Sequence, residues 1–313
     1  GINGKPVNPQ ATMTGTRSDT MILVSFDPET KDVGLLFIPR DTRVFIPDGH
    51  GYEKAAHAHA YGGPDLAIRT VEQFLDVPIH HYVRVDFEGF KRVVDALDGV
   101  EFDIPQDMYY SDPSQNLLID LKKGPTVLDG DKALQLVRYR QYENGDIGRV
   151  AVQKKFLEAL FARAKSLSTV LKIPQLYTAL APYVKTDLTY DDIVNLASLA
   201  SDVSLESLKI ATVPGIDKYI DDGHGELSYW VADSEQTAKL VDELIRGISR
   251  ERNASISVAV QEGNGVAGSA DALAASLRAE GFNVVSVGKA NRQDYQETRI
   301  VAPSGKRSSQ YLV

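Results

Sequence analysis

MILVSFDPETKDVGLLFIPRDT, residues 21–42, contains two six-residue apolar runs with a polar segment between them. The runs are Met21–Phe26 and Val33–Ile38, and the polar segment contains Pro28-Glu29-Thr30-Lys31. Short apolar runs separated by turn-forming residues are typical of two adjacent strands. This stretch therefore predicts a buried β-hairpin at the start of the fold.

Beyond the hairpin, apolar residues recur in turn at helical and at strand spacing. Helical spacing begins at Pro64, directly after Gly62-Gly63, and strand-like segments follow at residues 82–86 and 100–104. The predicted helices cover residues 64–75, 87–97, 149–165, 190–202 and 233–246. Alternating strands and helices predict an α/β protein, which we interpret as an α/β/α sandwich with a mixed central sheet.

The composition changes at residues 247–253, and a new cycle of elements begins there. It consists of strand 256–260, a glycine loop, helix 271–280, strand 283–287 and strand 298–302. This cycle indicates a second, small α/β unit. We therefore predict two domains, residues 1–248 and 254–313, with a boundary near residue 250. The second unit is short, which raises the question of whether its domain is complete.

The chain of 313 residues carries a formal net charge of −9 and contains no cysteine. Proteins with a general affinity for nucleic acids hold the phosphate backbone with a surplus of Lys and Arg. The negative net charge of this chain therefore argues against such a function. The lack of cysteine excludes disulfides, thiolate metal sites and cysteine nucleophiles. The sequence has no apolar run long enough to span a membrane.

Charged residues gather at the ends of the predicted strands, where α/β proteins place their sites. Arg17-Ser18-Asp19-Thr20 precedes the first strand, and Pro39-Arg40-Asp41-Thr42 follows the second. Further along the chain come Lys54, Arg138, Arg140, Asp146, Arg149 and Gln153. A set rich in arginine suits a multiply charged anion such as pyrophosphate, because guanidinium groups donate forked hydrogen bonds and keep their charge. Carboxylates among these cations indicate Mg²⁺ (or Mn²⁺), which prefers oxygen ligands.

Each of these clusters, taken alone, is also typical of a solvated surface. An isolated Arg-Asp pair is usually a surface ion pair. Arg138-Tyr139-Arg140 alternates like one face of an edge strand, and Arg149 with Gln153 fits the solvent side of a helix. Only the combination of clusters indicates a function.

Six short motifs follow one another along the first half of the chain. They are Arg17-Ser18-Asp19-Thr20-Met21, Ile38-Pro39-Arg40-Asp41-Thr42, Lys54 ahead of Tyr61-Gly62-Gly63, Leu128-Asp129-Gly130 with Ala133-Leu134, Val137-Arg138-Tyr139-Arg140, and Asp146-Ile147-Gly148-Arg149 with Gln153. In this order they resemble the LytR-CpsA-Psr family, from residue 1 to about residue 165. The tail resembles the LytR-type accessory domain often found behind this catalytic domain.

The resemblance implies an α/β/α domain that binds a polyprenyl-pyrophosphate lipid between its sheet and helices. It also implies a Mg²⁺-dependent phosphotransferase that moves a glycopolymer phosphate, such as wall teichoic acid or capsule, from this lipid to peptidoglycan. Such an enzyme works at the extracytoplasmic face of the membrane. We therefore expect a single N-terminal membrane anchor ahead of this sequence.

The resemblance further implies a role for each matching residue. The residues implied to contact the pyrophosphate are Arg17, Arg40, Lys54, Arg138, Arg140, Arg149 and Gln153. Asp19 matches a metal ligand, whereas Asp41 and Asp146 match carboxylates that either orient arginines or accept a proton. Asn3 stands where the family usually has an aspartate as second metal ligand. Because asparagine offers a carbonyl oxygen without charge, we expect a lower metal affinity.

Other patterns carry weaker functional signals. Ala55-Ala56 stands where the family more often has Ile-Asn, and we expect this to affect loop packing. Gly263-Asn264-Gly265-Val266-Ala267-Gly268 fits G-x-G-x-x-G, but no acidic residue ends the next strand as a dinucleotide site requires. His57-Ala58-His59 lacks a third zinc ligand. The apolar helix faces that would line a lipid tunnel are equally what any core requires.

Three functions fit these residues. The first is the phosphotransferase, the second is a non-catalytic module that binds lipid phosphates or cell-wall glycans, and the third is a phosphohydrolase that cleaves pyrophosphate with water. Metal-dependent turnover separates the second from the other two. An acceptor-dependent product separates the first from the third.

Overall fold

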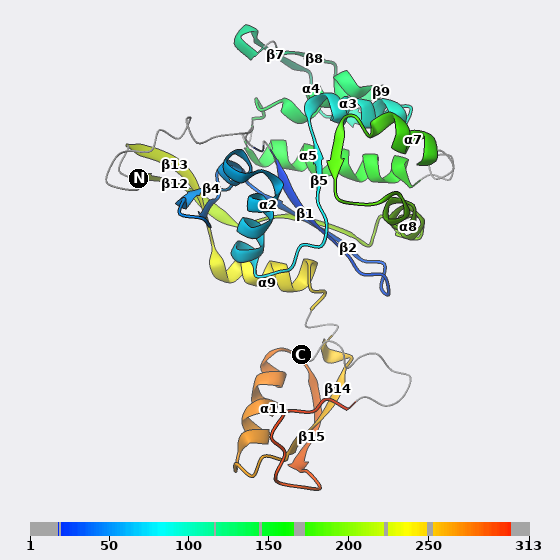
Figure 1. The fold of residues 1–313 in the computed structure, drawn as a ribbon. Helices are drawn as coiled ribbons and strands as arrows, with labels where there is room; N and C mark the ends of the chain where they lie inside the picture. Colours follow the sequence, from blue (N-terminus) through cyan, green and yellow to red (C-terminus); the bar gives the residue numbers. More distant parts are fainter. Residues whose placement is uncertain are drawn as a thin grey trace. The chain divides into compact units, whose positions relative to one another are not determined.

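The structure is a computed structural model that describes residue 18 and residues 20–115, 117–143, 146–165, 173–221, 225–248 and 253–301 (Figure 1). The chain forms two compact units, residues 1–237 and 238–313. No helix among the described residues is both long enough and apolar enough to cross a membrane.

A three-stranded mixed sheet lies at the centre of the first unit. β1 (Met21–Phe26) pairs antiparallel with β2 (Val33–Ile38), as predicted, and β11 (Leu208–Thr212) pairs parallel with the other edge of β2. The order β1-β2-β11 makes β2 the central strand, and four of its six residues are buried. β1 is more exposed than predicted, since the side chain of Val24 is 60% exposed. The mixed α/β class predicted from the sequence is therefore confirmed.

β2 leads through the turn at residues 39–42 into β3 (Arg43–Ile46), which pairs antiparallel with β4 (Gly51–Lys54). α2 (Ala55–Leu75) follows directly and is interrupted at Gly62 and Gly63, which have non-helical dihedral angles. The prediction of a helix that begins at Pro64 was therefore wrong about the first half of α2. That half forms because the backbone N–H groups of Ala55 and Ala56 find acceptors elsewhere in the fold, as the site below shows.

The upper part of the unit in Figure 1 is a helical pair packed on two hairpins. β5 (Val83–Val85) precedes α3 (Phe87–Ala96), which begins at Asp86, whose carboxylate accepts a hydrogen bond from Gly89 N at 2.7 Å. β6 pairs with β9, β7 pairs with β8, and α4 follows β9. The bounds of these elements are β6 (Val100–Ile104), β7 (Met108–Asp112), a 3-10 turn η2 (Pro113–Gln115), β8 (Leu117–Leu121), β9 (Gly124–Leu128) and α4 (Gly130–Arg138).

α5 (Asp146–Ala164) begins three residues before the predicted helix and joins this assembly to the central sheet. Val152 and Phe156 lie in the core formed with α3, α4 and the two hairpins. Phe161, further along α5, packs against Val33 and Leu208 of the sheet. The apolar faces of α3 and α5 thus contribute to the hydrophobic core of this unit.

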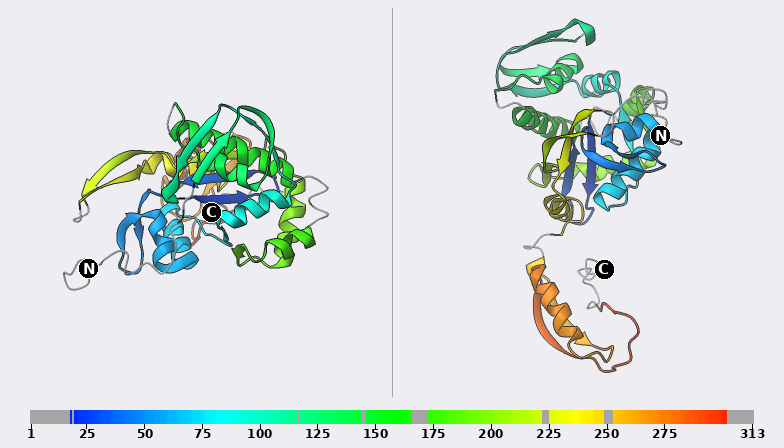
Figure 2. Two further views of the ribbon diagram at one scale, coloured as in Figure 1. Left: turned by 90° about the horizontal axis from the view of Figure 1, so that it is seen from above. Right: turned by 90° about the vertical axis from the view of Figure 1, so that its left-hand side faces the viewer.

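The rest of the first unit consists of α7 (Ile173–Leu180), β10 (Val184–Thr186), α8 (Tyr190–Ser201), β12 (Gly215–Asp221) and β13 (Glu226–Ala232). β10 pairs antiparallel with β5, and β12 pairs antiparallel with β13. The β7–β8 and β12–β13 pairs extend from the unit as two-stranded ribbons (Figure 2). α9 (Ser234–Leu244) spans the division between the two units.

The second unit contains a β-α-β arrangement. β14 (Ser257–Glu262) and β15 (Asn283–Lys289) are parallel, and α11 (Ser269–Ala279) connects them. Their shared core contains Val260, Ala270 and Ala274. These elements agree with the prediction within a few residues. The predicted strand at 298–302 was wrong for its described residues, because 298–301 have no strand partner.

Candidate active site

The turn after β2 is held by backbone hydrogen bonds from three directions. Thr42 is fully buried, and both its N–H and its hydroxyl donate to the carbonyl of Pro39, at 2.9 and 2.6 Å. The carbonyls of Thr42 and Arg40 accept hydrogen bonds from the first N–H groups of α2 at 2.8 and 3.0 Å. From β13, the N–H of Trp230 donates to the carbonyl of Asp41 at 2.9 Å. The backbone of this turn is therefore fixed while its charged side chains face outward.

Three of the predicted site residues meet at this turn. The Asp41 carboxylate accepts a hydrogen bond from Lys54 Nζ at 2.8 Å and one from Arg40 Nε at 3.3 Å. Burial alone would raise the pKa of Asp41, but the hydrogen bonds and charges of Lys54 and Arg40 outweigh it and leave the pKa lowered. Asp41 is thus a carboxylate at neutral pH, and two cations are bound to one anion.

Lys54 ends β4 and is the least exposed member of this group. Its side chain is 21% exposed, compared with 40% for Arg40 and 41% for Asp41. Its ammonium nitrogen lies 5.6 Å from the ring centre of the buried Tyr229 on β13. The aromatic face and the carboxylate together hold the lysine beside the turn.

Arg138 is the last residue of α4, so the interpretation of Arg138-Tyr139-Arg140 as one face of a strand was wrong. Tyr139 leaves the helix with extended angles and is buried against Tyr142, whereas Arg140 is exposed. The C-terminal position is favourable for Arg138, because the negative end of the helix dipole attracts a cation. The end of a helix was mistaken here for strand alternation.

The start of α5 lies beside the end of α4. Gln153 Nε2 donates to the carbonyl of Val137 at 2.9 Å, which satisfies one of the terminal acceptors of α4. Arg149 lies one helical turn before Gln153 on the same face of α5. Arg138, Arg149 and Gln153 therefore form a second group of predicted site residues.

The fold places both groups at one end of the central sheet. Phe161 of α5 packs at Val33 and Leu208, the first residues of β2 and β11. From there α5 runs back along the sheet, and its first turns lie toward the end where β2 terminates (Figure 1). Arg149 is twelve residues before Phe161, about 18 Å along the helix, which is comparable with the length of a six-residue strand. The Arg40 turn follows the end of β2, so Arg149 and this turn lie toward the same end of the sheet.

Several predicted residues lie outside the described part of the chain. They are Asn3, Arg17, Asp19 and the side chain of Asp146. Their roles in metal and pyrophosphate binding stay predictions.

The described residues do not by themselves provide a metal site. None of them form a group of three or more His, Cys, Asp or Glu side chains placed to hold an ion. Both oxygens of Asp41 are engaged by cations, and His57 pairs through Nδ1 with Glu53 at 3.0 Å. The predicted metal ligands Asp19 and Asn3 lie outside these described residues.

The glycine loop at residues 263–268 of the second unit binds a carboxylate of the protein itself, at the place where a dinucleotide site would bind phosphate. The carboxylate of Glu262 accepts a hydrogen bond from Gly268 N at 3.0 Å, and Asn264 accepts one from the Ser269 hydroxyl at 3.0 Å. Anions bind helix N-termini through such free N–H groups. Because a carboxylate already lies at the start of α11, these contacts favour a structural role for the loop.

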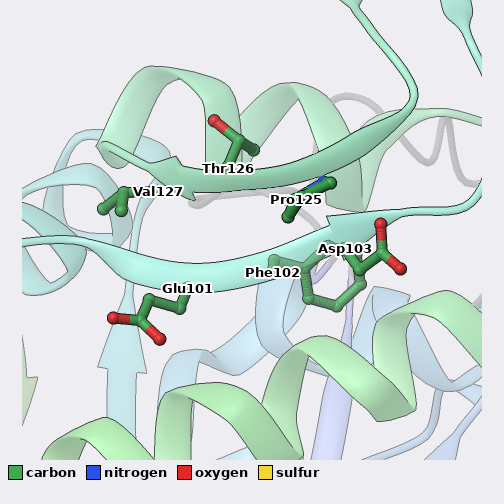
Figure 3. A pocket seen from close by; sticks show the side chains of 6 residues that line it. All are labelled: Glu101, Phe102, Asp103, Pro125, Thr126 and Val127. Atoms are coloured by element: carbon green, nitrogen blue, oxygen red, sulfur yellow. The ribbon is translucent and has the colours of Figure 1, made fainter.

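An open hollow lies on the paired strands β6 and β9 (Figure 3). It is lined by Glu101, Phe102, Asp103, Pro125, Thr126 and Val127. None of these residues belongs to the predicted site. The sequence analysis also missed Phe87, Tyr229 and Trp230, which contact the site residues.

Relatives of known name share this fold and sequence pattern. The polyisoprenyl-teichoic acid–peptidoglycan teichoic acid transferase TagV of Bacillus subtilis is 36% identical over 228 residues, which are 72% of this chain and 58% of TagV. TagT of the same species, named as the same type of transferase, is 35% identical over 219 residues, 69% of this chain and 66% of TagT. The chain thus spans about three fifths of the length of these relatives.

Solved structures agree with these matches. The crystal structure of B. subtilis TagV superimposes with a TM-score of 0.63 at 32% identity and covers 74% of this chain and 90% of that chain. The structure described as TagT bound to LI-WTA gives a TM-score of 0.58 at 30% identity, with 77% and 94% covered.

Two family models match the chain, one in each part. Residues 255–312 match the family described as LytR cell envelope-related transcriptional attenuator. Residues 4–246, well over half of the chain, match the LytR_cpsA_psr family. With this match, the relatives and the shared fold, the protein belongs to the LytR_cpsA_psr family.

Proposed function

We propose that this protein transfers a glycopolymer phosphate from a polyprenyl-pyrophosphate carrier to peptidoglycan. The observation that carries the proposal is the group of Arg40, Asp41 and Lys54 at the end of β2, where two cations converge on a rigid turn. The names of TagV and TagT, which are teichoic acid transferases, support this substrate class. We further propose that the first domain is an α/β/α sandwich and that the domains meet near residue 250.

The reaction exchanges one phosphorus–oxygen bond for another. A hydroxyl of peptidoglycan attacks the phosphorus that carries the glycopolymer, the bond to the bridging oxygen breaks, and polyprenyl phosphate leaves with the electron pair. The hydroxyl proton is lost to solvent or to a basic group. Negative charge grows on the leaving phosphate, and fixed cations at that position lower the barrier. Arg40, Lys54, Arg138 and Arg149 are proposed to provide these cations, together with Arg17 and Arg140.

Asp41 is proposed to orient cations and not to accept the proton. Its pKa is lowered by Lys54 and Arg40, whereas an efficient general base has a pKa near the working pH. Its two hydrogen bonds fix the positions of both side chains relative to the turn.

For Asp41→Asn we therefore expect turnover to fall about tenfold to a hundredfold, because both cations lose their anchor. The acidic limb of the pH–rate profile should keep its position between pH 5 and 8, since a carboxylate with a lowered pKa does not titrate there. Asp48→Asn, which removes an exposed partner of Arg69, is the matched control and should leave the rate unchanged. Disappearance of the acidic limb in Asp41→Asn would instead identify Asp41 as the base.

We also propose that Mg²⁺ (or Mn²⁺) is bound through Asp19 and Asn3 and neutralises phosphate charge. Release of polyprenyl phosphate from a polyprenyl-pyrophosphate oligosaccharide should then require the metal. Asn3→Asp should lower the Mg²⁺ concentration needed for half-maximal rate, because it adds a charged oxygen ligand. The same metal dependence in both proteins would show that residue 3 is not a metal ligand. Full activity in EDTA would show that the reaction does not require a divalent metal.

We also propose that the protein is anchored in the membrane and works at its extracytoplasmic face, because its proposed substrate is there. A polyprenyl-linked polymer is held in the membrane, so the enzyme has to work at its surface. Peptidoglycan places the acceptor outside the cytoplasm.

A further inference from the structure

The guanidinium of Arg138 lies over an aromatic ring. Its Cζ is 4.9 Å from the ring centre of Phe87, the first residue of α3. Cations within about 6 Å of a ring centre are attracted to the negative face of the ring. The two residues come from opposite ends of neighbouring helices, so the contact depends on how α3 and α4 pack.

α3 and α4 run antiparallel and approach very closely at the other end of the pair. Gly130, the first residue of α4, donates its N–H to the carboxylate of Asp95 at 2.7 Å. A Cβ atom at Gly130 would lie only 2.4 Å from the carbonyl oxygen of Lys91, so only glycine fits. Because this contact fixes the start of α4 against α3, the end of α4 falls beside Phe87.

Core packing does not account for the position of Phe87. Its side chain is 44% exposed, and it lies outside the core cluster around Phe156. Phe90, one turn later on α3, is the residue that packs into this cluster, with its ring centre 5.9 Å from that of Phe156. An exposed aromatic side chain at the start of a helix gains little from burial, whereas its ring face contacts the arginine.

The ring holds the guanidinium in a way that a carboxylate does not. Arg40 is held by Asp41, which cancels part of its charge. Phe87 attracts Arg138 through its quadrupole and carries no net charge, so this contact itself cancels none of the positive charge of the guanidinium. The hydrogen bond from Gln153 to Val137 also restrains the last turn of α4.

We propose that Phe87 is a positioning residue for Arg138, which it holds in the orientation that binds the pyrophosphate of the lipid substrate. The inference rests on the proposed function, because it assigns Arg138 to the same anion. It gives Arg138 an uncharged aromatic support, as the ring of Tyr229 does for Lys54.

The test compares Phe87→Leu with Phe87→Tyr, and Tyr109→Leu is the control at another exposed aromatic position. The first readout is the NMR chemical shift of the Arg138 side-chain protons. These protons sense the ring current of Phe87, so this readout does not depend on the activity of the protein. The second is the Kd for farnesyl pyrophosphate. We expect Phe87→Leu to lose the ring-current shift and to raise the Kd about two- to fivefold, and Phe87→Tyr to restore both. Tyr109→Leu should change neither.

A double-mutant cycle separates failure of this inference from failure of the proposed function. In an Arg138→Ala background, Phe87→Leu should have no further effect on the Kd, because the group that it positions is gone. If Arg138→Ala weakens binding but Phe87→Leu does not, the positioning role is wrong and the proposed function stands. If the protein does not bind farnesyl pyrophosphate, or Arg138→Ala binds it as tightly as the parent protein, the proposed function fails and this inference falls with it.

Discussion

Arg40→Ala is expected to lower the rate of polyprenyl phosphate release by about two to three orders of magnitude, without a change in the thermal unfolding midpoint. A fixed donor removed from a charge-stabilising site typically costs this much. The substitution removes only the side chain, which is 40% exposed, and keeps the backbone carbonyl that accepts the hydrogen bond from Ala56. The start of α2 should therefore stay intact while the anion site loses a cation.

Arg69→Ala is the matched control for this substitution. Arg69 also pairs with an aspartate, at 2.6 Å from Asp48, but it lies on the exposed side of α2. Exposed ion pairs contribute little to stability. The rate of polyprenyl phosphate release and the thermal unfolding midpoint of Arg69→Ala should therefore both match those of the parent protein. Equal rates for Arg40→Ala and Arg69→Ala would contradict the placement of Arg40 in the site.

Phe156→Ala should lower the free energy of unfolding by about 3 to 5 kcal/mol, the usual range for a buried phenylalanine. The side chain of Phe156 is 1% exposed and joins α5 to Phe90 of α3 and Phe102 of β6, with ring centres 5.9 and 6.2 Å away. Its removal leaves a cavity where the two helices and a hairpin meet. Urea unfolding followed by circular dichroism measures the loss.

Phe45→Ala provides the comparison for the Phe156 variant. Phe45 is 42% exposed on β3, where its ring centre lies 5.6 Å from that of Tyr52 in a T-shaped arrangement. Its truncation should cost about 1 kcal/mol or less, as is usual for surface positions. A loss at Phe156 no larger than that at Phe45 would show that the core is not centred on α5.

Local chemistry explains where prediction from the sequence succeeded. The hairpin of β1 and β2 was predicted with its bounds because the turn-forming residues Pro28-Glu29-Thr30-Lys31 separate its two apolar runs. In the structure the carboxylate of Asp27 stabilises this turn by accepting hydrogen bonds from the N–H groups of Glu29 and Thr30. α8 likewise begins at a capping box between Thr189 and Asp192. In both places the residues that form the structure are neighbours in the sequence.

Prediction failed where distant groups decide the structure. The first half of α2 begins without a side-chain cap, and carbonyls of the Arg40 turn provide its first hydrogen bonds. At Arg138, two arginines around a tyrosine fit strand alternation, whereas packing of α4 against α3 makes the first of them helical. Local sequence signals do not contain either contact.

The candidate site divides in the same way. The charged residues are recognisable in the sequence because they lie at or near the ends of strands and helices. Their supports are not, since the ring of Tyr229 lies beside Lys54, the backbone N–H of Trp230 binds the carbonyl of Asp41, and Phe87 reaches Arg138 across a helix pair. These supporting residues are aromatic, and aromatic residues are equally expected in any core.

The central claim is acceptor-dependent transfer, and product analysis tests it most directly. A polyprenyl-pyrophosphate oligosaccharide labelled in its sugar would be incubated with this protein and Mg²⁺, with and without peptidoglycan. We expect the label to become attached to peptidoglycan through a phosphodiester. We also expect polyprenyl phosphate to be released at a rate that depends on the acceptor. Equal release without peptidoglycan, with free sugar phosphate as product, would show a hydrolase, and binding without release would show a binding module. Either result would contradict the account.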